Sequence, residues 1–149
     1  MRVVAAPDKF RGTVSATEAA SAIARAVASA GGTTLEVPMA DGGEGLLEVL
    51  GGPDRTTQVT GPLGSPVKAG WRLSGGTAVV EMARASGLAL AGGAEGNRPL
   101  DATTTGVGEL LRHAVELGAR RIIVGMGGSA TTDGGLGALD AMGSPSRYR

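Results

Sequence analysis

The sequence predicts an α/β protein that begins with a β-α-β unit and continues into a second, mixed α/β region. Three observations lead to this fold class. An apolar run, an amphipathic helical pattern and a second apolar run succeed one another over residues 2–37. Three strand patterns then follow with only turns between them, and a helix pattern and a further strand come after these. Because a β-α-β unit joins parallel strands, part of the sheet structure is expected to be parallel.

The β-α-β unit is marked by clear start and stop signals. The apolar residues 2–6 predict a buried first strand. Ser15 and Glu18 have the spacing of a capping box, so a helix is expected to begin directly after Ser15 and to stop at Gly31. Residues 34–37 predict the second strand of the unit.

The middle of the chain has the pattern of an antiparallel meander. A short helix is expected over residues 46–50, and a domain change near residues 50–60. The strands of the meander are expected over residues 56–60, 67–73 and 77–82. A loop-rich region is expected over residues 87–104. The remaining predicted elements are a helix over residues 105–117, a buried strand over 121–124, a glycine-rich loop over 125–135 and a helix beginning over 136–142.

Composition and charge exclude several classes of protein. Fourteen basic and fourteen acidic residues cancel, so there is no basic surface for nucleic acid or an anionic membrane. The chain has no cysteine and a single histidine, His113, which excludes a thiolate zinc site and a multi-histidine metal site. No apolar run reaches the roughly 18 residues of a bilayer span. We therefore expect a cytoplasmic protein that acts on small molecules.

The strongest local signal is the loop GGSATTDGG, residues 127–135, between a predicted strand and a predicted helix. Its glycines allow a ligand to approach the backbone, and free N–H groups in such loops bind phosphate. Ser129, Thr131 and Thr132 add hydroxyl groups. Asp133 could hold Mg²⁺ or accept a proton from an attacking hydroxyl, or it could simply cap the next helix.

Part of the same loop matches a second template. The stretch GMGGSA fits G-x-G-x-x-G/A, the dinucleotide-binding fingerprint. The helix breakers that follow it and the lack of an acidic residue about 20 positions later weaken this match. A dinucleotide-binding domain is therefore kept only as a minor alternative.

Two further loops follow predicted strands, where open α/β sheets bind their ligands. In PMADGGEG, Asp41 and Glu44 could hold a metal or orient a polar substrate, unless Asp41 caps the short helix. In PDKFRG, Lys9 and Arg11 could neutralise a carboxylate or phosphate, unless they form a solvated turn. We interpret the other polar positions as structural. ATTTG, residues 102–106, is expected to cap the following helix, His113 to lie on the flank of that helix, and Glu81 to lie on ordinary surface.

Six motifs in one order carry a family resemblance: PDKFRGT, PMADGGEG, TGPLGSPV, VVEMARASGL, NRPLDATTTGVGEL and GMGGSATTDGG. This series closely resembles the bacterial glycerate kinase family, which phosphorylates D-glycerate with ATP. The resemblance runs from Val3 to about Gly143. Two positions depart from the family pattern, because Arg11 stands where lysine is common and Thr132 where many members have asparagine.

The resemblance implies a phosphoryl transfer from ATP to a hydroxyl of D-glycerate, with ATP and Mg²⁺ as cofactors and no nucleic-acid or membrane partner. It implies two α/β domains, one of them Rossmann-like. Residues 1–55 are then an incomplete part of the Rossmann-like domain, and residues 56–143 an incomplete second domain that carries the GGSATTDGG loop. Residues 144–149 form an atypical tail, and since the family runs far beyond this loop, a truncated or frame-shifted product is expected.

The resemblance also selects the residues expected to carry the reaction. Asp41, Asp133 and Lys9 are the expected catalytic residues, and Asp133 is also the expected metal ligand. The expected substrate- and phosphate-binding residues are Arg11, Gly42, Gly43, Glu44, Gly127, Gly128, Ser129, Thr131 and Thr132. The alternative from a different class is an inactive fragment that at most binds glycerate or an anion.

Overall fold

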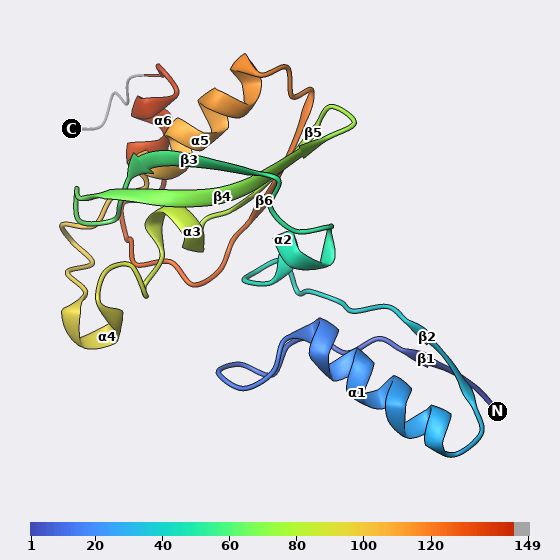
Figure 1. The fold of residues 1–149 in the computed structure, drawn as a ribbon. Coiled ribbons are helices and arrows are strands. Elements are labelled where there is room, and N and C mark those ends of the chain that lie inside the picture. The colour runs from blue at the N-terminus through green and yellow to red at the C-terminus, as the bar shows by residue number, and fades with distance from the viewer. Residues whose placement is uncertain (145–149) are drawn as a thin grey trace.

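The computed structural model describes residues 1–144, which form two sheets with their helices (Figure 1). A parallel pair consists of β1 (Arg2–Ala5) and β2 (Thr33–Glu36), and a larger sheet has the order β3-β4-β5-β6. The larger sheet contains β3 (Arg55–Thr60), β4 (Pro66–Ser74), β5 (Thr77–Glu81) and β6 (Arg121–Gly125). The helices are α1 (Ala16–Ser29), α2 (Leu46–Val49), α3 (Ala83–Ser86), α4 (Gly93–Gly96), α5 (Thr105–Glu116) and α6 (Leu136–Ala141).

This architecture confirms the predicted mixed α/β class. Residues 145–149, most of the tail expected to be atypical, lie outside the described residues. Among residues 1–144, no helix has both the length and the apolar character that a bilayer span requires. The region expected to be loop-rich contains α4, a helix of a single turn that the sequence pattern did not predict.

The β-α-β unit forms as predicted, apart from the burial of its first strand. The Ser15 side chain accepts the Glu18 N–H, and the Glu18 carboxylate accepts the Ser15 N–H, so the capping box begins α1. β1 and β2 pair in parallel with Val4 opposite Leu35. These two side chains are 61% and 52% exposed, so the prediction of a buried first strand was wrong. Within the described residues α1 is the element that packs on this pair, and a helix covers one face only.

The larger sheet begins as the predicted meander. β3, β4 and β5 pair antiparallel in succession, and α5 then carries the chain across to β6, which pairs in parallel with β5. β6 was expected to be buried, but it is the edge strand of the sheet and Ile123 is 36% exposed. The core between this sheet and its helices contains Val59, Ala69, Trp71, Ala78, Val80, Met82, Ala85, Val107, Leu110 and Ala114.

Candidate functional site

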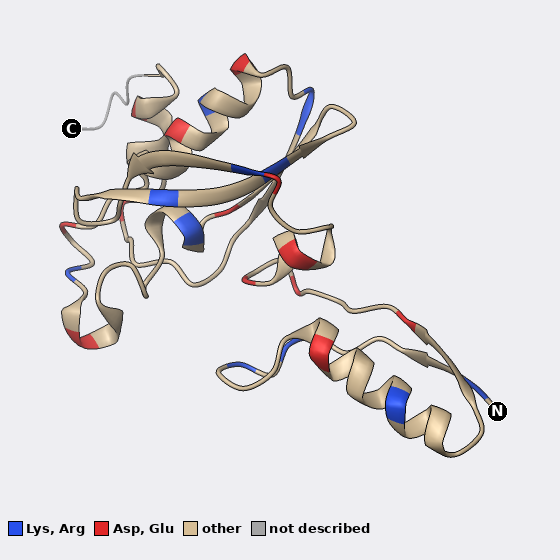
Figure 2. Cartoon of the chain, viewed as in Figure 1, with Lys and Arg blue, Asp and Glu red and all other residues tan. Residues whose placement is uncertain are grey.

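The loops that leave β1 and β2 meet because parallel strands end at the same edge of a sheet. Lys9 lies on the loop after β1 and Asp41 on the loop after β2, and Lys9 Nζ is 3.5 Å from Asp41 Oδ1. Figure 2 shows basic residues, in blue, on the loop between β1 and α1, and acidic residues, in red, on the segment that leads into α2. The β-α-β topology thus brings together two of the predicted catalytic residues.

Asp41 is held as an ionised group. Its Oδ1 accepts the Gly43 N–H at 2.9 Å. This backbone bond, followed by the charge of Lys9, holds the pKa of Asp41 below its ordinary value. The alternative that Asp41 caps α2 does not hold, because the N-cap of that helix is Gly45 and no side chain caps it. The second carboxylate oxygen of Asp41 remains available to a ligand.

A third loop, the glycine-rich segment after β6, packs directly on the loop after β2. A Cβ atom on Gly127 would lie 2.8 Å from Gly43 Cα, and one on Gly125 would lie 3.2 Å from the Gly42 carbonyl oxygen. Real Cβ atoms are essentially never found as close as the first contact, so Gly127 requires glycine, while a side chain on Gly125 would need the backbone around Gly42 to shift slightly. The glycines of this loop therefore serve a close approach of two backbones, rather than solely the approach of a ligand.

The three loops enclose a cavity of about 220 Å³. Seven of its lining residues are among the predicted site residues. The lining residues are Lys9, Arg11, Asp41, Gly43, Glu44, Met126, Gly127 and Gly128. Arg11 and Glu44 form no ion pair within residues 1–144, so their charges are free for a ligand. The cavity can receive a small polar molecule with two cations and two carboxylates around it.

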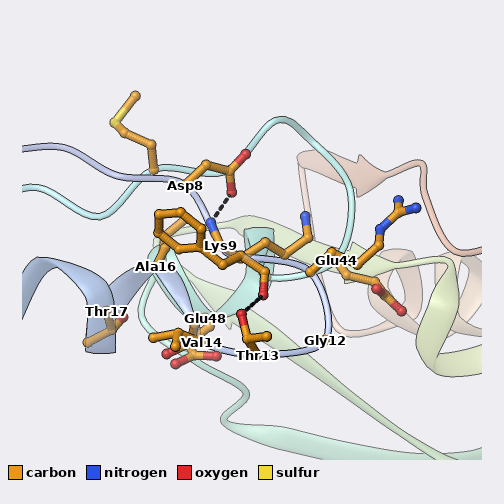
Figure 3. A pocket seen from close by; sticks show the side chains of 15 residues that line it. Asp8, Lys9, Gly12, Thr13, Val14, Ala16, Thr17, Glu44 and Glu48 are labelled. Atoms are coloured by element: carbon orange, nitrogen blue, oxygen red, sulfur yellow. Dashed lines mark hydrogen bonds between the residues drawn. The ribbon is translucent and has the colours of Figure 1, made fainter.

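A second cavity of about 310 Å³ is lined by the loop after β1 and by residues of α2 (Figure 3). The two cavities share Lys9, Arg11 and Glu44. Residues 8–17, Met39, Gly45, Glu48 and Val49 complete the lining of the second one. Its walls are more apolar than those of the first, where backbone and charged groups dominate.

The hydroxyl groups of the GGSATTDGG loop lie outside these two cavities. The Ser129 and Thr131 hydroxyls bond to each other at 2.8 Å, and Thr132 Oγ1 donates to the Pro99 carbonyl at 2.8 Å. None of the three lines either cavity. The loop therefore contributes Gly127 and Gly128 to the charged cavity, while the Ser129 and Thr131 hydroxyls bond each other and Thr132 joins the loop to Pro99.

The Asp133 carboxylate accepts four hydrogen bonds from other residues of the protein. Its Oδ2 accepts from the Thr104 N–H and Oγ1 at 2.8 Å each and from the Gly137 N–H at 3.3 Å. Its Oδ1 accepts the Gly135 N–H. Burial alone would raise the pKa of Asp133, but these hydrogen bonds outweigh it and lower the pKa. Asp133 thus joins the loop to the first turn of α5.

The hydrogen bonds of each carboxylate indicate which of them could hold Mg²⁺. Three of the four hydrogen bonds to Asp133 fall on Oδ2, and Oδ1 accepts only the Gly135 N–H, so Oδ1 keeps one acceptor position. No group of three or more histidine, aspartate or glutamate side chains within residues 1–144 forms a protein cage for a metal. Mg²⁺ usually needs only one or two carboxylates together with phosphate and water. Asp41 and Glu44 at the charged cavity fit that requirement, whereas Asp133 lies outside both cavities and could offer a metal only its Oδ1 atom.

We expect Asp133→Asn to destabilise the chain by about 2 kcal/mol at pH 7, because an amide nitrogen cannot accept the N–H and O–H groups around it. The lowered pKa means that Asp133 contributes stability above the ordinary carboxyl range and loses it as the pH falls below about 4. The difference between wild type and Asp133→Asn should therefore shrink on acidification. Urea unfolding at pH 7 and pH 3 measures this, with and without Mg²⁺. A stabilisation by Mg²⁺ that disappears in Asp133→Asn would contradict the structural role.

Glu81 is a functional candidate that the sequence pattern missed. It was expected on ordinary surface, yet it is 3% exposed. Its carboxylate accepts the Leu47 N–H at 2.8 Å and the Arg84 Nε–H at 2.9 Å. The larger sheet thereby holds the start of α2, directly after Glu44 of the charged cavity. A signal was available, because Glu81 ends a run of apolar strand residues.

Two structural expectations have clear outcomes. The ATTTG segment was expected to cap α5, and Thr103 Oγ1 does accept the N–H of Thr105, the first residue of α5, at 3.1 Å. The Thr104 side chain makes no cap bond and instead bonds Asp133. His113 packs edge-on against Trp71 with ring centroids 6.0 Å apart, which agrees with the expected structural role.

Comparison with known proteins gives a consistent set of relatives. A family model described as "Glycerate kinase family" matches residues 3–146, slightly beyond the expected limit at Gly143. The chain is 46% identical to "Glycerate 2-kinase" of Escherichia coli (strain K12), covering 97% of this chain and 40% of the relative. It is 48% identical to "Glycerate kinase" of Bacillus subtilis (strain 168), covering 96% and 39%.

A solved structure agrees with these relatives. The crystal structure described as a glycerate kinase 2 from Salmonella typhimurium LT2 matches with a TM-score of 0.79 and 43% identity, over 96% of this chain and 41% of that one. The chain thus spans about two fifths of the length of the relatives it matches.

Proposed function

Because the chain belongs to the glycerate kinase family, we propose that it carries part of the site of a kinase that transfers the γ-phosphoryl group of ATP to a hydroxyl of D-glycerate. The observation that supports this most directly is the cavity of about 220 Å³ in which three loops gather two cations, two carboxylates and exposed glycine backbone. Residues 1–55 and 56–143 are, in this proposal, parts of two domains of such an enzyme, which acts in the cytoplasm.

The charged cavity suits a small hydroxy acid. Lys9 and Arg11 would neutralise the glycerate carboxylate or an incoming phosphate, and cation–carboxylate hydrogen bonds are among the strong ones. Asp41 would accept a hydrogen bond from a glycerate hydroxyl and orient its oxygen toward the phosphoryl group. Phosphoryl transfer depends mainly on such positioning and on charge neutralisation. Gly127 and Gly128 would let the ligand lie close to backbone N–H groups.

Mg²⁺ would neutralise phosphate charge when bound, and Asp41 and Glu44 are the residues proposed to hold it. Lys9 keeps the carboxylate of Asp41 close to the phosphate path through their 3.5 Å ion pair. Asp133 is proposed to position the glycine-rich loop through Thr104, in place of the catalytic role expected from its motif.

The second candidate is a binding fragment without turnover, which the coverage of about two fifths of the relatives favours. We expect the purified chain to bind D-glycerate, and an assay of ADP release and phosphoglycerate formation with Mg-ATP separates the two candidates. Product formation supports the kinase, and binding without product supports the fragment. A chain that folds but shows no heat of glycerate binding would contradict both.

A further inference from the structure

One edge of the larger sheet is formed by β3, which has β4 as its strand neighbour on one side only. We propose that the open side of β3 pairs antiparallel with β3 of a second copy of this chain, so that two larger sheets join into one. The groove beside β3 shares no lining residue with the two cavities described above. Pairing at β3 thus does not depend on the proposed function.

The register of β3 shows which of its backbone groups face outward. The Thr60 N–H donates to the Glu109 carboxylate of α5 at 2.7 Å, and the residue opposite Thr60 on β4 is Pro66, which has no N–H. Thr60 therefore faces away from β4. Because the outward direction alternates along an antiparallel ladder, Thr56 and Gln58 face away as well. Within residues 1–144, their backbone groups make no hydrogen bond to an element other than β4.

β3 lacks the features that usually protect an edge strand. Proline, lysine or a covering segment commonly prevents edge-to-edge pairing. The strand reads RTTQVT, with neither proline nor lysine, and its one charged side chain, Arg55, lies over the Trp71 ring at 5.7 Å. The carboxylate from α5 covers only the Thr60 end. The exposed residues Thr56 and Gln58 therefore stay open to another strand.

A second copy of β3 matches this open stretch. In an antiparallel two-fold pairing centred on Thr57, Thr56 lies opposite Gln58 of the copy, and Gln58 lies opposite its Thr56. Each of these two pairs exchanges both backbone bonds, which gives four hydrogen bonds across the interface. A two-fold interface requires such a self-complementary surface. The ladder ends at Thr60, because its N–H is already bonded within the chain.

α5 lies beside β3 and runs in the opposite direction (Figure 1). Its first half is joined to the end of β3 through Glu109 and Thr60. Its second half lies near Thr57, because the Trp71 Nε1–H donates to Thr57 Oγ1 and His113 packs edge-on against the Trp71 ring. The second half of α5 is therefore the part that approaches the same helix of the copy.

The charges of this part of α5 suit a second copy. A groove of about 440 Å³ lies between β3 and α5, and Glu109, Arg112, His113 and Glu116 form its helical wall. Arg112 Nε is 3.6 Å from Glu116 Oε1, and both side chains are more than half exposed. When two such helices approach antiparallel around the two-fold axis, Arg112 of each copy can face Glu116 of the other. The same two charges thus complement themselves across the interface.

Sedimentation velocity of the full 149-residue chain, over a range of protein concentrations, measures this association. The wild type should form a dimer as the concentration rises. Gln58→Pro removes an outward N–H and no bond to β4, and proline is tolerated at such positions of an edge strand. Symmetry removes two interface hydrogen bonds at once, so the dimer should weaken about tenfold or more. Thr56→Pro should have the same effect, and circular dichroism checks that both variants are folded.

Charge reversal provides a readout that a structural defect would not produce. Arg112→Glu and Glu116→Arg each place like charges across the two-fold axis, so each variant alone should dimerise less than the wild type. An equimolar mixture of the two should restore the dimer, because every pair across the interface then joins opposite charges. Arg25→Glu is the matched control, since Arg25 is an exposed arginine of α1 that does not line the groove. It should associate as the wild type does.

Three results would overturn the proposed pairing. The first is a wild type that stays monomeric at every concentration. The second is a dimer that Gln58→Pro and Thr56→Pro leave unchanged, because another surface would then carry the association, such as the exposed face with Val4 and Leu35. The third is a mixture of the two charge-reversed variants that dimerises no better than either variant alone.

Discussion

Replacing Trp71 with alanine is expected to cost about 3–5 kcal/mol of unfolding free energy, the usual range for removing a large aromatic side chain from a core. Trp71 is fully buried in the centre of the larger sheet, where its neighbours in the core include Val80 and Leu110. Its Nε1–H also donates to Thr57 Oγ1 at 2.9 Å. The core is otherwise made of aliphatic side chains, and His113 packs only edge-on against the ring, so alanine would leave a large space unfilled.

Urea unfolding followed by circular dichroism measures this loss, since the variant has no tryptophan fluorescence. Thr57→Val is the matched control, because it keeps the ring and removes only the acceptor of its N–H group. This control should cost about 1–2 kcal/mol. A Trp71→Ala variant that loses less than the Thr57→Val variant would show that the ring does not organise the core. The part of the candidate site that lies next to β6 and α2 is held by the same sheet. Glycerate binding should therefore be lost in proportion to the folded protein that is lost.

Local signals in the sequence predicted most of the secondary structure. The capping box at Ser15 and Glu18 placed the start of α1, because its two reciprocal hydrogen bonds depend on residues only three positions apart. The turns between β3, β4 and β5 likewise depend on neighbouring residues. The meeting of Lys9 and Asp41 was also predictable, since parallel strands direct their following loops to one edge.

Apart from this meeting of two loops, features that depend on distant contacts were not predictable. Burial of β6 depends on its place at the sheet edge, which its own apolar sequence does not reveal. The roles of Glu81 and Asp133 depend on donors 34 and 29 positions away. Motif spacing indicates where a carboxylate lies, but it cannot show that Asp133 accepts hydrogen bonds from Thr104 and Gly137. The close contact between the backbones at Gly43 and Gly127 was also not predicted. Glycines at these positions are equally typical of a phosphate-binding loop, so the sequence does not distinguish the two roles.

Asp41→Asn is expected to weaken D-glycerate binding about tenfold or more and to lower any turnover by roughly a hundredfold. Asparagine Oδ1 can still accept the Gly43 N–H, so the loop should keep its shape while the charge is lost. The pKa of Asp41 is already below its ordinary value, so the wild-type carboxylate stays ionised from pH 8 down to pH 5. Wild-type binding should therefore show no step from Asp41 in that range, and the defect of the variant should stay constant.

Calorimetric titration with D-glycerate across this pH range, together with ADP release, measures both effects. Asp101→Asn is the matched control, because Asp101 also carries an exposed carboxylate near a cation, with Arg98 Nη1 3.7 Å away, but lines neither cavity. The control should bind as the wild type does. Because Asp41 is 68% exposed in its ion pair with Lys9, loss of this pair alone should change stability little. A large loss of binding without a loss of stability therefore points to direct contact between Asp41 and the ligand, whereas normal binding in Asp41→Asn would remove Asp41 from the proposed site.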